Sequence, residues 1–199
     1  MFITKAGPLY RMATEKKLNW MYSGFMNSGS GPLCRKTFDV FFRYRFHQRR
    51  DGMMEVKIGE EERQLIGDLI DQLRELLLAT SPEGKLDPSL RRLYPTAYVD
   101  DVRHEQEYQR SARDQLLERR LSHLDVVEAT LNDAELDSDS VTAWITTVND
   151  LRLVLGTHLD VSEDDESKIL DSGEPQEQQQ AIYHYLSHLL GEFVEAAGR

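Results

Sequence analysis

The sequence has little cysteine, and this absence bounds its chemistry first. Cys34 is the single cysteine among 199 residues, which excludes an internal disulfide framework and a zinc site built from several thiolates, and fits a reducing, cytoplasmic compartment. No uncharged apolar run reaches 18 residues, so no membrane span is expected. Nucleophile elbows, Walker loops, dinucleotide fingerprints and paired CxxC motifs are also missing. The sequence therefore predicts neither an enzyme nor a cofactor.

Charge is plentiful but unevenly distributed. The chain has 35 acidic and 24 basic residues, and residues 1–58 carry a net charge of +7 whereas residues 59–199 carry −18. An acidic body is repelled by phosphates and favours a partner protein with a basic surface. Nucleic-acid binding stays open as the alternative, through the arginines of the basic segment: Arg43, Arg45, Arg49 and Arg50.

Residues 1–35 predict a flexible basic leader, because they are rich in glycine and serine near their end and lack the apolar core of a signal peptide. The leader is either a real tail or the product of a start codon assigned too far upstream. Residues 36–199 are expected to form one helical domain with an N-terminal β-hairpin.

The hairpin is predicted from two strand-like runs, 37–46 and 53–58, separated by a turn at HQRRDG. Apolar residues at three- and four-residue spacing then predict long helices at 60–80, 102–131, 138–155 and 175–197, with a short helical turn at 88–93 and an acidic helix or loop at 162–173. The expected fold class is mainly α, a helical bundle with a small N-terminal β-hairpin.

Details of the helices give further expectations. Gly156 is expected to end the third long helix, Arg120 to lie on a solvated mixed-charge face, and Val194 to belong to the buried stripe of the last helix. The wide apolar stripes of the first and last helices fit a monomer core or a dimer seam equally well, so the oligomeric state stays open.

His184 and His188 are four residues apart, a spacing at which two imidazoles reach one metal ion, with Glu192 as a third ligand. The pair lies nearly opposite the apolar stripe, so solvated surface histidines are the favoured interpretation and a metal-dependent enzyme is the weakest alternative. Cys34 sits beside Arg35 and Lys36, which can lower a thiol pKa; it is an incidental thiol or a redox handle.

Two stretches supply interaction candidates. Asn149, Asp150 and Arg152 place polar groups beside an apolar helix face, where a buried arginine needs a partner; the group is an inter-helix pin or a recognition site. Arg91, Arg92 and Tyr94 precede a proline break and either line a surface notch or pack the loop.

The stretches LRRLYPTAYVDD at 90–101 and AWITTVNDLRLVLGTHLDV at 143–161 resemble an actinobacterial domain-of-unknown-function family that includes the AosR-type oxidative-stress transcriptional regulators and is often encoded beside ClpS. The resemblance covers residues 36–197. It implies regulation through protein contacts, with a sigma factor or RNA polymerase as partner, or an adaptor role in Clp proteolysis. A redox-switching member is expected to use two cysteines, and this chain has one.

Overall fold

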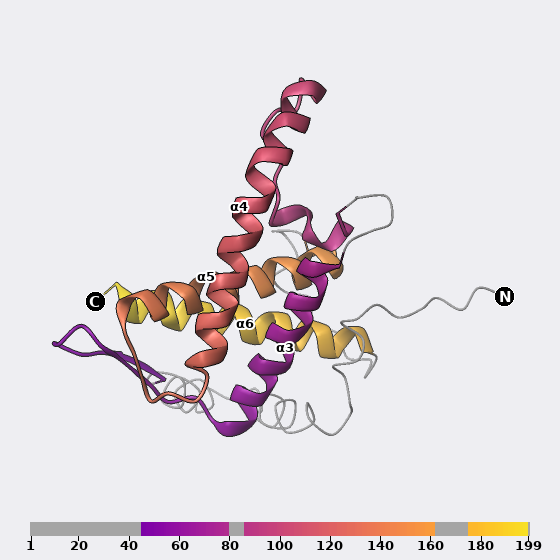
Figure 1. Cartoon of the computed structure of the whole chain (residues 1–199). Helices are drawn as coiled ribbons and strands as arrows, with labels where there is room; N and C mark the ends of the chain where they lie inside the picture. The colour runs from indigo at the N-terminus through magenta and orange to yellow at the C-terminus, as the bar shows by residue number, and fades with distance from the viewer. Residues whose placement is uncertain (1–44, 80–85, 162–174, 199) are drawn as a thin grey trace.

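A computed structural model of the chain describes residues 45–79, 86–161 and 175–198 (Figure 1). Most of these residues are helical, in α3 (Glu60–Leu78), α4 (Val102–Ala129), α5 (Ser138–His158) and α6 (Pro175–Ala197), with a short 3-10 helix, η2 (Pro88–Arg92). Three short strands, β1 (Phe46–Gln48), β2 (Met54–Val56) and β3 (Glu135–Leu136), form an antiparallel sheet in the order β1-β2-β3. The predicted mainly α fold is confirmed.

The core forms around α5, which contacts α3, α4, α6, η2 and β3. Trp144 of α5 is fully buried, and its indole N–H donates to Oγ1 of Thr130 at 2.9 Å, which satisfies its one polar group. Phe193 of α6 lies between that ring and the sheet. The centroid of its ring is 5.6 Å from that of Trp144 and 3.6 Å from that of Phe46. Aromatic stacking thereby ties β1 to both central helices.

The hairpin pairs Phe46 with Val56 and Gln48 with Met54. The amide of Arg49 donates a hydrogen bond to the carbonyl oxygen of Met53 at 2.8 Å and closes the turn. Within the turn Gly52 adopts a positive φ of +87°. His47 and Gln48 were predicted to lie in the turn, and this is wrong, because both still pair with β2. The predicted residues 37–44 lie outside the described part. The third strand was not predicted; two residues carry too short a pattern for detection.

The helix predicted at 60–80 is confirmed as α3. Its first turn is acidic, which suits the positive end of the helix dipole, and Oε2 of Glu62 accepts the amide of Gly59 at 3.0 Å. The predicted turn at 88–93 is η2, and its side-chain cap is Asp87, which accepts the amide of Ser89 at 2.8 Å.

Gly156 does not end α5, contrary to the prediction. The helix continues to His158, and the left-handed position is taken by Asp160 at φ 51°. Gly156 is buried inside the helix, where an added Cβ would lie 2.9 Å from Cε2 of Tyr183 on α6. Glycine is used here for close helix packing.

In α6 the predicted stripe is correct for Ile182, Leu186, Leu189 and Phe193, which are buried, and wrong for Val194, which is 53% exposed. None of the helices that the structure describes combines enough length and apolar character to cross a bilayer.

Candidate functional site

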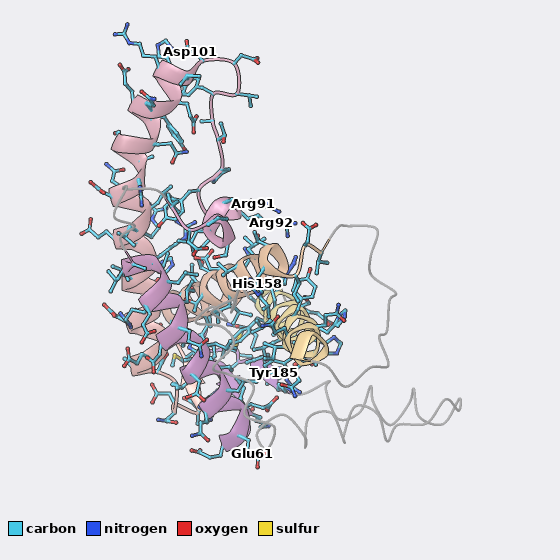
Figure 2. The ribbon with its side chains drawn as sticks, turned by 90° about the vertical axis from the view of Figure 1, so that its right-hand side faces the viewer. Glu61, Arg91, Arg92, Asp101, His158 and Tyr185 are labelled. Atoms are coloured by element: carbon cyan, nitrogen blue, oxygen red, sulfur yellow. The ribbon has the colours of Figure 1, made fainter. Side chains whose placement is uncertain are left out.

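The most distinctive surface is a projecting arm, defined as residues 95–112. It consists of the loop 95–101 and the first part of α4, and it extends away from the helices that form the core (Figures 1 and 2). With 28 residues, α4 is about 42 Å long at 1.5 Å per residue. The first buried side chain of α4 is Leu124, so residues 102–123 of the helix contribute no fully buried residue among those described.

Glu105 fastens the loop to the helix. Its Oε2 accepts the amides of Ala97 at 2.9 Å and Tyr98 at 2.8 Å. Gln109, one turn later, donates to Oε1 of Glu105 at 2.6 Å and to the carbonyl of Pro95 at 3.3 Å. The amide of Tyr98 is the main reason that the pKa of Glu105 is lowered, with the Gln109 side chain second. These bonds give the loop a defined conformation.

Asp101 caps α4. Its Oδ1 accepts the amides of Arg103 at 3.1 Å and His104 at 3.0 Å, and its Oδ2 lies 2.6 Å from Nδ1 of His104. The His104 amide and then its ring lower the pKa of Asp101. A carboxylate that orients an imidazole is part of a nucleophile-activating arrangement. Both side chains are exposed, and neither lines one of the two pockets described below, so the pair acts as a cap.

Large apolar side chains lie exposed on the arm: Tyr98 is 49%, Val99 82%, Val102 73% and Tyr108 36% exposed. The ring of Tyr98 is the centre of a small aromatic group, with centroids 5.8 Å from His104 and 6.1 Å from Tyr108. Elsewhere in the described part, exposed large apolar side chains occur as Leu78 on α3 and Val194 on α6.

The candidates on η2 divide into surface and packing residues. Arg91 is exposed and lies 3.6 Å from Asp160 Oδ1. Arg92 donates to the carbonyl of Val161 at 3.0 Å and so ties η2 to the end of α5. Tyr94 is buried under the guanidinium of Arg120, 5.0 Å from its ring centroid; burial raises its pKa.

Of the α5 candidates, Asp150 and Arg152 act as inter-helix pins. Asp150 is buried and pairs with Arg120 of α4 at 3.1 Å. Arg120 was predicted to be solvated, and this is wrong. Its position on α4, between Leu117 and Leu124, faces α5, and its side chain is only 15% exposed. Arg152 lies over the ring of Tyr183 on α6, 5.8 Å from its centroid. Asn149 is partly buried.

Two arginines of the basic hairpin segment are paired with carboxylates of the fold. Arg45 contacts Glu62 and Glu192, and Arg49 pairs with Asp51 and Glu135. Arg50 is exposed. Arg43, like Cys34 and the leader, lies outside the described residues. The described hairpin geometry therefore does not favour a nucleic-acid site.

His184 and His188 are exposed on α6, as predicted. Glu192, the third ligand of the metal hypothesis, has a side chain that is only 16% exposed and faces Arg45. Among the described residues no group of three or more His, Cys, Asp or Glu is arranged to hold a metal ion.

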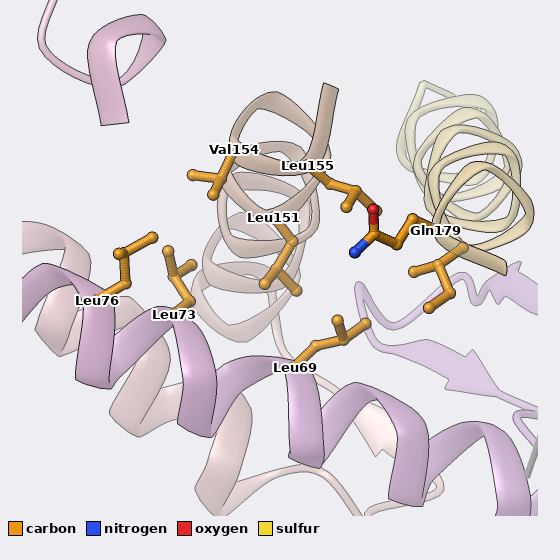
Figure 3. A pocket seen from close by; sticks show the side chains of 8 residues that line it. Leu69, Leu73, Leu76, Leu151, Val154, Leu155 and Gln179 are labelled. Atoms are coloured by element: carbon orange, nitrogen blue, oxygen red, sulfur yellow. The ribbon is translucent and has the colours of Figure 1, made fainter. Parts of the chain in front are cut away.

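Two pockets are small. One, of about 20 Å³, lies between α3, α5 and α6 and is lined by leucines, with Gln179 at its edge (Figure 3). An apolar void of this size holds at most one water molecule. The second, of about 250 Å³, lies between η2 and the end of α5, and is below the usual range of small-molecule sites.

The loop 95–101 lies within the stretch 90–101 that carries the family resemblance, but the sequence analysis did not predict Val102, Glu105 or Tyr108 as part of a site. The available signal was the position of Val102 and Tyr108, large apolar residues of α4 that lie outside the leucine stripe. The anchoring by Glu105 has no sequence signal, since it depends on how the loop folds back on the helix.

Comparison with known proteins identifies the family of this chain. A family model described as "Domain of unknown function (DUF2017)" matches residues 43–197, which include the sheet, α3 to α6 and the arm. No curated protein and no solved structure gives a match.

Proposed function

We propose that this chain, which belongs to the DUF2017 family, is a non-enzymatic regulatory protein that acts by binding another protein through its arm. The observation that carries the proposal is the set of exposed apolar side chains on the arm: Tyr98, Val99, Val102 and Tyr108. Exposed apolar side chains that gather at one place indicate a contact surface, whereas single ones do not.

The arm is prepared for binding. Glu105 and Gln109 hold the loop on α4 before any partner arrives, so less conformational entropy is lost on association. Tyrosine is among the residues that carry binding energy most often, because it buries a large rigid area at low entropic cost.

The partner is a protein with an apolar groove bordered by basic side chains. The arm carries four acidic residues, Asp100, Asp101, Glu105 and Glu107, against the two arginines at 103 and 110. The chain from residue 59 onward is strongly acidic, at −18. Complementary charge speeds association and weakens with salt.

Within this role we propose an accessory transcriptional regulator of the oxidative-stress response in actinobacteria, located in the cytoplasm, with a sigma factor or RNA polymerase as partner. The support is the resemblance of residues 90–101 and 143–161 to the actinobacterial family that includes the AosR-type regulators, and the first of these stretches contains the loop of the arm. A Clp-associated adaptor role is the competing outcome.

The test compares the full chain with Val99→Ser/Val102→Ser. The control is Leu78→Ser/Val194→Ser, which removes two exposed apolar side chains outside the arm. Each is used to capture proteins from host extract, and affinity is then measured with purified RNA polymerase carrying its sigma factors and with purified ClpS. We expect the arm variant to weaken binding at least about tenfold, the control to bind normally, and 0.3 M salt to release the partner.

Binding that survives the arm variant, or that ignores salt, would overturn the docking role of the arm. Stable capture of ClpS with the same dependence on the arm would keep the docking role and replace transcriptional regulation by proteolytic adaptation. Recovery of nucleic acid alone would refute the proposal. Thermal melts check that both variants stay folded.

A further inference from the structure

A cluster of charges is enclosed where the hairpin meets the helices. It is defined as Arg45, at the start of the hairpin, Glu62 in the first turn of α3, and Tyr185 and Glu192 on α6. Arg45 Nη1 lies 3.0 Å from Glu62 Oε1, and its Nε lies 3.9 Å from Glu192 Oε2. The side chains of Arg45, Glu62 and Glu192 are 13%, 12% and 16% exposed. Three segments far apart in sequence therefore meet through buried charges.

The two carboxylates compete for one guanidinium. Glu62 lies within hydrogen-bonding distance of Arg45, whereas 3.9 Å is too long for a hydrogen bond to Glu192. Both oxygens of Glu192 are buried, and neither has a hydrogen-bond partner within the described residues. An ionised carboxylate in that position would be poorly compensated.

Neighbouring groups on α6 do not supply the missing positive charge. His188 precedes Glu192 by one turn. Part of its ring remains exposed, but partial desolvation and then Arg45 lower its pKa, which favours neutral imidazole at pH 7. Burial first, and then Glu62, raise the pKa of Tyr185, so its hydroxyl keeps its proton. Glu195 adds a second negative charge on the same helix.

We propose that Glu192 takes up a proton from solvent when the hairpin and α3 pack on α6, so that the cluster is a proton-operated latch on the hairpin. With the proton bound, the cluster contains one carboxylate and one guanidinium, and it is balanced. Loss of the proton leaves two buried carboxylates on one arginine and loosens the contact.

The electrostatics support this direction. Burial is the largest cause that raises the pKa of Glu192, to about 7; Arg45 partly opposes it, and Glu62 and Glu195 add to it. An unfolded glutamate has a pKa of about 4.3. Because the folded value is the higher one, the stability contributed by this group is complete below about 4.3 and is lost as the pH rises through 7. The latch is therefore closed in mild acid and weakest in mild base.

The experiment follows the full-length protein between pH 5.5 and 8.5. Carbon-13 NMR of the glutamate carboxyls, assigned with Glu192→Gln, reports the titration of Glu192 directly. Amide exchange of β1 and β2, corrected for intrinsic chemistry, reports opening of the hairpin. We expect a Glu192 midpoint near 7 and, by linkage, protection that falls about tenfold more between pH 6 and 8.5 than in Glu192→Gln.

Glu61→Gln is the matched control, because it removes an exposed carboxylate next to Glu62 that does not raise the pKa of Glu192; it should keep the pH dependence. Glu62→Gln should move the Glu192 midpoint downward, since a like charge is removed. A midpoint near the ordinary glutamate value in the wild-type protein would overturn the proposal even if the variants did not fold. Equal pH dependence of hairpin exchange in wild type and Glu192→Gln would also overturn it.

Discussion

Nε of Arg120 on α4 lies 3.1 Å from Oδ2 of Asp150 on α5, with side chains only 15% and 9% exposed. Arg120 also donates to the carbonyl of Leu93 at 2.8 Å and covers the ring of Tyr94. Burial raises the pKa of Asp150, and Arg120 opposes that rise. This one arginine thereby joins α4, α5 and the chain after η2.

Breaking that pair should be costly. Arg120→Met leaves the Asp150 carboxylate buried without its cation, and we expect a loss of about 3–5 kcal/mol in the free energy of unfolding, measured by urea denaturation. Arg119→Met, at an exposed neighbouring position, should change it by less than about 0.5 kcal/mol. Equal effects of the two substitutions would show that the pair is not a pin.

Gly156 and Gly191 should respond oppositely to alanine. An added Cβ at Gly156 would meet the Tyr183 ring at 2.9 Å, so Gly156→Ala should destabilise by about 1–3 kcal/mol. At Gly191, also helical, nothing lies within 4 Å, so Gly191→Ala should stabilise by about 0.5–1 kcal/mol. Thermal unfolding of both variants checks the pair; stabilisation by Gly156→Ala would contradict the packing found here.

Phe193 and Val194 are neighbours in sequence with opposite surroundings. Phe193 is fully buried between Trp144 and Phe46, and Phe193→Ala should cost about 3–5 kcal/mol and shift Trp144 fluorescence. Val194→Ala, at a 53% exposed position, should cost less than about 0.5 kcal/mol. A large loss at Val194 in the isolated protein would indicate that this side chain is covered in solution.

Glu105 should control the loop of the arm without controlling the fold. Glu105→Ala removes the acceptor of the Ala97 and Tyr98 amides, so both should exchange several-fold faster by NMR while the midpoint of urea unfolding stays nearly constant. Glu107→Ala, an exposed position paired with Arg103 at 3.5 Å, is the control and should leave both amides protected.

The same bond gives a pH dependence. The pKa of Glu105 is lowered, first by the Tyr98 amide, so its stabilising effect is present above the unfolded glutamate pKa of about 4.3 and is lost as the pH falls through the lower folded value. Corrected exchange of the two amides should therefore be flat from pH 7 to 5 and rise in stronger acid. Loss of protection already at pH 6 would show that another group holds the loop.

The helices were predictable because apolar spacing reports the face that each buries. The same reasoning failed for Arg120, which was predicted to be a solvated charge because of its residue type. Its position on α4 faces α5, and its side chain is buried against Asp150, a partner distant in sequence. Gly156 was predicted to end the helix because sequence rules consider only neighbouring residues, whereas the reason for a glycine here is the close approach of Tyr183 on another helix. Val194 lies next to the buried Phe193 but just outside the buried face. A wide apolar stripe in the sequence does not show where that face ends.

The site was less predictable than the fold. Exposure of Val99 and Val102 depends on α4 extending beyond its neighbours, and sequence periodicity gives the length of a helix but not the extent of its packing. The anchoring of the loop by Glu105 joins residues seven and eight positions apart, outside the helical spacings that pattern analysis uses.

Because α4 extends beyond the core, the residues proposed to bind a partner are separate from the residues that stabilise the fold. On the proposed function, the exposed side chains of the arm bind the partner, and they pack little against the core, so substitutions in the arm and in the core should have additive effects on stability. Related chains can therefore exchange the residues of the arm, and with them their partners, while the same helices and sheet persist. Divergence confined to residues 95–112 would then record changes of partner rather than loss of constraint.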